Sequence, residues 1–177
     1  MDTDRRFGAR STALEVVQGL DLHGRRAIVT GGAGGLGLET VRALAVAGAE
    51  VTLAVRRAEQ GEAAAAALRE QHPGVALRVG RLDLSDLASV AAFAAAWGNA
   101  PLHMLVNNAA VMACPLSRTA RGWELQFATN HLGHLALTRA LLPALQAGAP
   151  SRLVSLSSTG HKIAGVDFDD LPSDRRP

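Results

Sequence analysis

A glycine cluster near the start of the chain separates a short apolar run from a run of helical periodicity. Residues 26–30 (Arg-Ala-Ile-Val-Thr) precede the glycines, and residues 36–47 carry apolar side chains at helical spacing. A strand that turns at once into a helix needs backbone angles that glycine adopts without strain. Glycines also let the backbone touch a pyrophosphate, whose charge the helix N-terminus stabilises. Because strand and helix are both present, the pattern favours a dinucleotide-binding loop over a plain structural turn.

The remainder of the chain continues this alternation of strands and helices. Strands are predicted at 50–55, 76–82, 102–106 and 152–156, and helices at 57–70, from Ser85 or Asp86 to 97, and at 122–145. Such alternation predicts an α/β fold with a doubly wound parallel sheet of the Rossmann type. We expect one NAD(P)-binding domain over residues 1–177, in which residues 1–20 form an extension with a short helix capped by Ser11 or Thr12.

Composition excludes several classes of protein. The 18 basic and 16 acidic residues nearly balance, which argues against a nucleic-acid-binding surface. No apolar stretch approaches the roughly 18 residues that a membrane span requires. A single cysteine, Cys114, cannot form an internal disulfide. We therefore expect a cytoplasmic protein without nucleic-acid or membrane partners, in which Cys114 is a small buried hydrophobe rather than a reactive thiol.

Two arginines stand where a nucleotide-binding fold selects its cofactor. An acidic residue at the end of the second strand binds the ribose hydroxyls of NAD, whereas an arginine suits the 2′-phosphate of NADP. Arg56 and Arg57 lie there, nineteen and twenty residues after Gly37. The alternative is that both arginines are merely solvated at a helix start, where the helix dipole disfavours their charge. The pattern favours NADP over NAD.

Several segments, in order, resemble the short-chain dehydrogenase/reductase family. Thr30-Gly31-x-x-x-Gly35-x-Gly37 resembles its cofactor motif, and residues 107–110 (Asn-Asn-Ala-Ala) resemble its Asn-Asn-Ala-Gly segment, with Ala110 replacing the glycine. Residues 83–84 are similar to the pair that flanks the adenine ring in that family. The cofactor contacts that the resemblance implies are Thr30, Gly31, Gly35, Leu36, Gly37, Arg56, Asp83, Leu84, Asn108 and Ala109.

The same resemblance implies part of a catalytic site. Asn130 falls where the family places an asparagine that supports a proton relay, and Ser158, at the end of the fifth predicted strand, matches its catalytic serine. The sequence around these motifs, including residues 167–170 (Asp-Phe-Asp-Asp), resembles that of the retinol-dehydrogenase-like and WW-domain-oxidoreductase-like subgroup. The implied reaction is hydride transfer between a nicotinamide and a small-molecule carbonyl or alcohol.

The family's proton donor has no counterpart in this sequence. The resemblance implies a tyrosine whose pKa a lysine four residues later lowers, both on a helix after the serine. The chain contains no tyrosine, and its single lysine, Lys162, lies four residues after Ser158. We therefore expect an incomplete domain, truncated after the fifth strand and inactive as given, with that strand as an open, apolar edge.

The sequence leaves two other functions open. The chain could instead be a non-catalytic NADP-binding or interaction module, or a truncated product without function. His161 is an alternative proton donor, and the sequence leaves the homo-oligomeric state and the substrate open. The histidines lack an accompanying carboxylate cluster, so we expect no metal site; they are His103, His131, His134 and His161.

Overall fold

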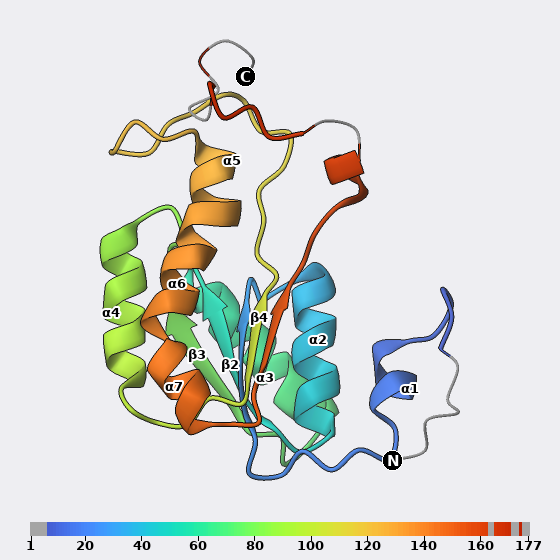
Figure 1. Cartoon of the computed structure of the whole chain (residues 1–177). Coiled ribbons are helices and arrows are strands. Elements are labelled where there is room, and N and C mark those ends of the chain that lie inside the picture. Colours follow the sequence, from blue (N-terminus) through green and yellow to red (C-terminus); the bar gives the residue numbers. More distant parts are fainter. Residues whose placement is uncertain (1–6, 163–164, 171–173, 175–177) are drawn as a thin grey trace.

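The computed structural model describes residues 7–162, 165–170 and 174, and it contains one parallel sheet (Figure 1). The strands are β1 (Arg26–Thr30), β2 (Glu50–Val55), β3 (Leu77–Arg81), β4 (Met104–Asn107) and β5 (Arg152–Ser155). Their order is β3-β2-β1-β4-β5, and every pairing is parallel. The predicted doubly wound α/β fold is confirmed. The chain leaves β1 toward one edge and returns to β4 on the other side, so the loops after β1 and β4 diverge and leave a crevice where ligands bind in such sheets.

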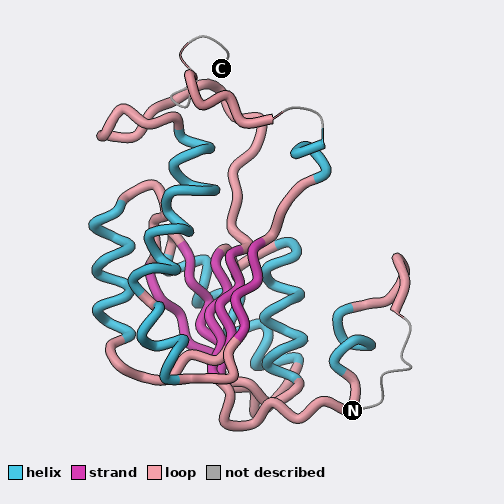
Figure 2. The backbone as a smooth tube through the Cα atoms, viewed as in Figure 1, coloured by secondary structure: helices cyan, strands magenta, loops and turns pink. Residues whose placement is uncertain are grey.

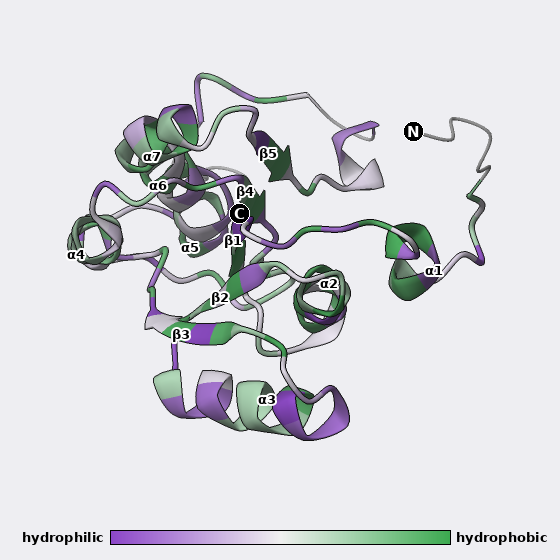
Figure 3. Cartoon of the chain, turned by 90° about the horizontal axis from the view of Figure 1, so that it is seen from below, coloured by the Kyte–Doolittle hydropathy of each residue, from purple (hydrophilic) through white to green (hydrophobic). Residues whose placement is uncertain are grey.

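Helices cover both faces of the sheet, as the end-on view shows (Figure 3). On one face, α2 (Gly35–Val46) and α3 (Ala58–Gln71) bury a cluster that includes Val29 and Leu53. On the other face, α4 (Leu87–Trp97), α6 (His134–Ala140) and α7 (Leu142–Ala147) bury a second cluster around Ile28 and Leu105. These four strand side chains are fully buried, and each such burial stabilises the fold by about 1.5–3 kcal/mol. The buried positions of β1 and β2 are apolar except for Thr30 and Thr52, as expected where helices cover both faces of a sheet.

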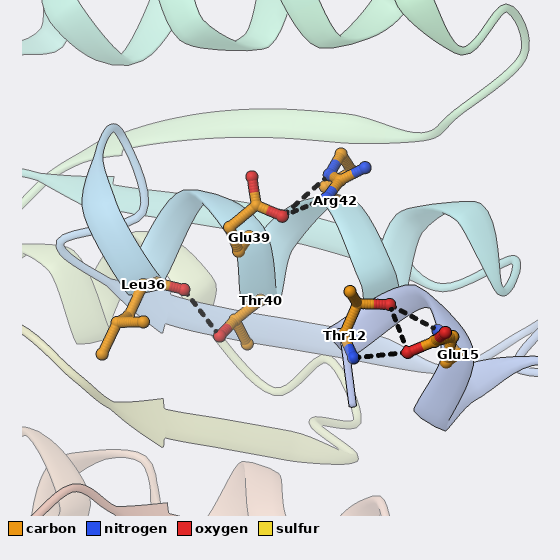
Figure 4. Close-up of polar contacts among 6 residues, drawn as sticks. All are labelled: Thr12, Glu15, Leu36, Glu39, Thr40 and Arg42. Atoms are coloured by element: carbon orange, nitrogen blue, oxygen red, sulfur yellow. Dashed lines mark hydrogen bonds and ion pairs between the residues drawn. The ribbon is translucent and has the colours of Figure 1, made fainter. Parts of the chain in front are cut away.

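The N-terminal extension contains a short helix, α1 (Ala13–Val17), which contacts α2. Thr12 caps it, as one of the two predicted caps. The Glu15 backbone N–H donates to Thr12 Oγ1, and the Thr12 N–H donates to the Glu15 carboxylate at 2.7 Å (Figure 4). This reciprocal capping box satisfies two of the four N–H groups that a helix start leaves unpaired. The same view shows the ion pair of Glu39 with Arg42 on α2.

The helix predicted at residues 122–145 is not continuous, which corrects the sequence analysis. It begins with α5 (Leu125–Phe127), passes through a π-helical segment, η1 (Ala128–Gly133), and breaks between α6 and α7. Gly133 lies so close to the loop after β3 that an added Cβ would come within 2.2 Å of the Leu84 carbonyl oxygen. We attribute the helix break to Pro143 in the first turn of α7, since proline cannot donate a backbone hydrogen bond to the preceding turn.

Strand β5 is an edge of the sheet, as expected (Figure 2). Leu153 and Val154 are 49% and 47% exposed. The strand ends at Ser155, one residue before the predicted end at Leu156, and a 3₁₀ turn (Thr159–Lys162) follows. Among the described residues, no helix has the length and apolar character needed to cross a membrane.

Candidate nucleotide-binding site

The glycine loop joins the carboxyl end of β1 to the amino end of α2. Gly31 and Gly35 have φ values of 68° and 53°, in the left-handed region that side chains disfavour. The Gly31 N–H donates to the Ala54 carbonyl oxygen (2.8 Å), which ties the loop to β2. A Cβ added at Gly34 or Gly35 would meet no atom within 4 Å, so the space before the helix N-terminus is open. Leu36, in the first turn of α2, is 74% exposed.

Gly37 makes the tightest contact of this loop. A Cβ on this residue would lie 2.4 Å from the Gly31 carbonyl oxygen and 2.5 Å from Asn108 Nδ2. Both neighbours are held in place, because the Gly31 N–H donates to the Ala54 carbonyl oxygen and Asn108 Nδ2 donates to the Thr30 carbonyl oxygen, each at 2.8 Å. Only glycine therefore lets the first turn of α2 rest on the loop, and the backbone N–H groups of that turn stay accessible to an anion.

Thr30 joins the glycine loop to the loop after β4. Its side chain is fully buried, and its Oγ1 accepts the backbone N–H groups of Asn108 and Ala109, both at 2.9 Å. These bonds fix the Asn-Asn-Ala-Ala segment across the crevice between β1 and β4. The geometry brings together Thr30, Gly31, Gly37, Asn108 and Ala109, all of which the sequence assigned to the cofactor.

His134 completes this arrangement, although the sequence analysis considered it only as a metal ligand. Its Nε2 lies 2.9 Å from Thr30 Oγ1, and its Nδ1 lies 3.0 Å from the carbonyl oxygen of Asn130. Burial lowers the pKa of the ring below its ordinary value, the hydrogen bond to Asn130 opposes that shift, and nearby His131 adds to it. A histidine four residues after Asn130 on an apolar helix face was the available signal.

Asn107 is a second buried residue that the sequence analysis did not single out. Its Nδ2 lies 3.1 Å from Thr138 Oγ1 on α6 and 3.4 Å from Ser155 Oγ on β5. Its Oδ1 is buried without a hydrogen-bond partner among the described residues. The side chain joins three elements, and its position at the carboxyl end of β4 places it beside the predicted site.

Two adjoining pockets open at the carboxyl ends of the strands. One, of about 720 Å³, lies over the glycine loop and the start of α3, and the other, of about 150 Å³, extends toward the loop after β3. Gly31, Arg56 and Ala110 line both, whereas Asp83 and Ala109 line only the smaller one. Such a groove, with glycine backbone on one side and an arginine on the other, suits an extended phosphorylated ligand.

The two arginines after β2 differ in their surroundings. Arg57 Nε donates to Gln60 Oε1 at 3.0 Å, so this guanidinium is held along the first turn of α3. Arg56 is exposed and forms no ion pair with any residue in the part of the chain that the structure describes. Its guanidinium donors are therefore available to a phosphate over the pockets.

Asp83 and Leu84 follow β3 rather than closing it, since the strand ends at Arg81. Asp83 Oδ1 accepts the Ser85 N–H (2.9 Å) and hydroxyl (2.6 Å), an Asx turn that begins the approach to α4. Leu84 is buried against the second hydrophobic cluster and lines the smaller pocket. The carboxylate of Asp83 thus has one oxygen engaged within the loop and is half-buried at the pocket wall.

The two predicted catalytic residues are not joined by any hydrogen bond in the described structure. Asn130 lies in η1, where its Oδ1 accepts the Val111 N–H (2.9 Å) and its Nδ2 donates to the Val111 carbonyl oxygen (2.8 Å). Its amide is therefore engaged with the loop after β4. Ser158 is exposed between β5 and the 3₁₀ turn, and its Oγ accepts the Gly160 N–H at 3.1 Å.

A further pocket, of about 670 Å³, lies against α4 and β3, and its lining reaches the first residues of β1 and β2. Phe93 and Trp97 line it together with Arg78 and Glu50, which form an ion pair at 3.1 Å. None of the predicted site residues contributes to it, and it lacks a glycine loop or helix N-terminus. We place the candidate site at the carboxyl ends of the strands instead.

Comparison with known proteins agrees with this geometry. The family model described as short chain dehydrogenase matches residues 25–167, from β1 past β5. The chain belongs to the short-chain dehydrogenase family. The resemblance drawn from the glycine motif and the four later segments is confirmed at the family level.

Relatives within the short-chain dehydrogenase family include oxidoreductases and retinol dehydrogenases. A Streptomyces antibioticus protein named probable oxidoreductase is 51% identical over 159 residues, which are 89% of this chain and 53% of that protein. Homo sapiens retinol dehydrogenase 12 is 42% identical over 174 residues, covering 97% of this chain and 54% of its own. The retinol-dehydrogenase-like subgroup is confirmed. The chain spans about half the length of the curated relatives it matches.

Solved structures of short-chain dehydrogenases share the fold. A crystal structure of a Mycobacterium paratuberculosis protein superposes with a TM-score of 0.79 at 38% identity, covering 94% of this chain and 57% of the other. A metagenomic short-chain oxidoreductase solved in complex with NADP gives a TM-score of 0.65 at 33% identity, covering 77% of this chain and 63% of the other. The five-stranded sheet is thus the amino-terminal part of a short-chain dehydrogenase fold.

Proposed function

We propose that this chain binds NADP at the carboxyl ends of β1, β2 and β4, as the nucleotide-binding part of an oxidoreductase for a small-molecule carbonyl or alcohol. The observation that carries the proposal is the position of Arg56, which lines both pockets and has no ion-pair partner among the described residues. An arginine presents a planar fork of donors that matches a 2′-phosphate, whereas NAD offers hydroxyls there. One solved relative is in complex with NADP, which supports the same choice.

The proposed roles of the other residues follow from their places in the groove. The loop of Gly31, Gly35 and Gly37 seats the pyrophosphate at the start of α2, where N–H groups and the helix dipole favour an anion. Asp83 and Leu84 bound the adenine side, and the exposed Leu36 lies beside the glycine loop in the first turn of α2. Thr30 holds Asn108 and Ala109 beside the ribose. The bound nicotinamide would exchange a hydride with the substrate carbon, while Ser158 would polarise the substrate oxygen.

Cofactor preference tests the proposal directly. Titration calorimetry of the 177-residue chain should give NADP an affinity at least about tenfold above that of NAD, or about 1.4 kcal/mol. Arg56→Asp should reverse the order, because a carboxylate repels the 2′-phosphate and accepts hydrogen bonds from ribose hydroxyls. Arg139→Asp is the matched control, since this exposed arginine occupies the last turn of α6, away from the loop. Equal affinities of the parent chain for NADP and NAD would contradict the assignment of NADP as the cofactor.

A second function is favoured by one sequence observation. The 177 residues contain no tyrosine, which suits a module that binds NADP without chemistry, as a sensor or interaction partner. The two functions differ in turnover, not in nucleotide binding. The 177 residues are expected to lack turnover in either case, so the DNA downstream of the Pro177 codon discriminates between them, and a continuation that encodes Tyr-x-x-x-Lys would favour the oxidoreductase.

A further inference from the structure

The end of β1, the loop after β4 and the π-helical segment are linked through a single buried ring. His134, on α6, contacts Thr30 at the end of β1 through Nε2 and Asn130 in η1 through Nδ1. Through Thr30 it reaches the backbone of Asn108 and Ala109, beside β4. Through Asn130 it reaches Val111, farther along the same loop. The glycine loop, the loop after β4 and the π-helical segment are therefore joined by one histidine side chain.

The partners determine which form of the ring fits. The Asn130 carbonyl oxygen can only accept, so Nδ1 carries a hydrogen, and in the neutral ring Nε2 is an acceptor. The Thr30 hydroxyl then donates to Nε2 at 2.9 Å. Its two lone pairs accept the N–H groups of Asn108 and Ala109, so its single donor and both acceptor sites are used.

A proton on the ring is incompatible with this arrangement. Nε2 would become a donor, and Thr30 Oγ1 would face three donors with two lone pairs. The Thr30 hydrogen would have to turn to the Val106 carbonyl oxygen, which lies at 3.4 Å. One of the hydrogen bonds from the Asn108 or Ala109 N–H would be lost, which leaves a half-buried donor without its partner.

We propose that His134 is a positioning residue that holds the nucleotide-binding loops through Thr30, and that protonation of its ring weakens nucleotide binding. The part of this proposal that concerns nucleotide binding, its nucleotide arm, rests on the proposed function. The part that concerns the position of the loops does not. The lowered pKa of the ring agrees with a neutral form in the folded state. The charge of His131 also lowers the pKa of the His134 ring.

Few other ionisable groups surround the ring. Helices α4, α5 and α7 and strand β4 contain none within their bounds, although their caps and loops do. The ionisable residues on the elements packed against His134 and on the loops that border them include Arg26, Asp83, Asp86, His103, Cys114, Arg118, Arg121, Glu124, His131, Arg139 and Arg152. His131 is the one of them whose charge contributes to the lowered pKa of His134. His131 is thus the neighbour that needs a control.

The sign of the pH dependence follows from the neutral form. Nucleotide binding should be tightest above the ordinary histidine pKa of 6.5 and should weaken as the pH falls through the lowered pKa of the folded protein. By linkage, bound nucleotide should lower the pKa of His134 further. The 2′-phosphate of NADP itself titrates at about pH 6. The informative quantity is therefore the difference in NADP affinity between variants measured at the same pH.

The first test follows the network without nucleotide. In ¹H–¹⁵N NMR spectra of the whole chain, the amide signals of Asn108 and Ala109 should shift with the titration of the His134 ring. His134→Gln, which retains an acceptor for the Thr30 hydroxyl but does not titrate, should abolish that shift, and His131→Gln should keep it. The proposal would be overturned if these amide signals in the parent chain did not shift as the His134 ring titrates. This measurement does not depend on the folding of any variant.

The second test measures the affinity for NADP by calorimetry between about pH 5 and about pH 8. The parent chain should lose about fivefold or more in affinity relative to His134→Gln at the acidic end, and the two should agree at the alkaline end. His131→Gln should follow the parent. An unchanged ratio across this range, with NADP bound, would overturn the nucleotide arm. If no nucleotide binds at any pH, the proposed function fails, and the NMR result alone decides whether His134 positions the loops.

Discussion

At the scale of single residues, the site depends on contacts too close for any side chain. Gly37→Ala places a methyl group within 2.4 Å of the Gly31 carbonyl oxygen and 2.5 Å of Asn108 Nδ2. Neither atom can retreat cheaply, because one belongs to the backbone and the other is hydrogen-bonded to Thr30. We expect the free energy of unfolding to fall by about 1–3 kcal/mol, and nucleotide affinity to fall with it. Urea denaturation with calorimetry measures both quantities.

Gly34→Ser is the matched control for this loop. A Cβ at Gly34 meets nothing within 4 Å, its φ of −166° is ordinary extended backbone, and serine is a favourable N-cap for α2. Its free energy of unfolding should stay within about 0.5 kcal/mol of the parent. Equal stability of Gly37→Ala and the parent chain would show that the loop relaxes more readily than its geometry implies.

At the scale of elements, β5 is the part of the sheet most prone to association. It is an edge strand with unpaired backbone groups, and Leu153 and Val154 are about half exposed. We expect the chain to self-associate with rising concentration, and Val154→Lys to reduce this, because a lysine on an edge strand opposes pairing with another strand. Light scattering after size exclusion checks the expectation. Val46→Lys, at a similarly exposed position on α2, should leave association unchanged; equal suppression by both variants would contradict an edge-strand origin.

At the scale of the whole molecule, nucleotide binding and chemistry should separate. Reduction of a carbonyl leaves an alkoxide that must be protonated, and a positioned acid contributes about 10²–10⁴-fold to the rate. The chain has no tyrosine, and Lys162 is exposed in a 3₁₀ turn. We expect no oxidation of NADPH above a protein-free blank with a panel of aldehydes and ketones. Turnover abolished by Ser158→Ala would contradict this, and turnover abolished only by His161→Ala would assign the proton to that histidine.

Much of the fold followed from local pattern. The bounds of β1 and β2 were predicted to the residue, because apolar runs bounded by glycine and charged residues have few other structures. The caps Thr12 and Asp86 were each one of two predicted candidates, because side-chain oxygens before a helix satisfy its first N–H groups. The π-helical segment was missed, since it arises where Gly133 meets the Leu84 carbonyl oxygen, a contact between distant parts of the chain.

By itself, the sequence determined the α/β alternation, the glycine loop before α2 and the arginines after β2, because each depends on neighbours within a few residues. Only the tertiary structure decided that Thr30, Asn108 and His134 form one hydrogen-bonded group, since 104 residues separate Thr30 from His134. These hydrogen bonds matter for stability because the groups that form them are largely buried. A hydroxyl, two amides and an imidazole removed from water must satisfy one another, and no local pattern encodes that pairing.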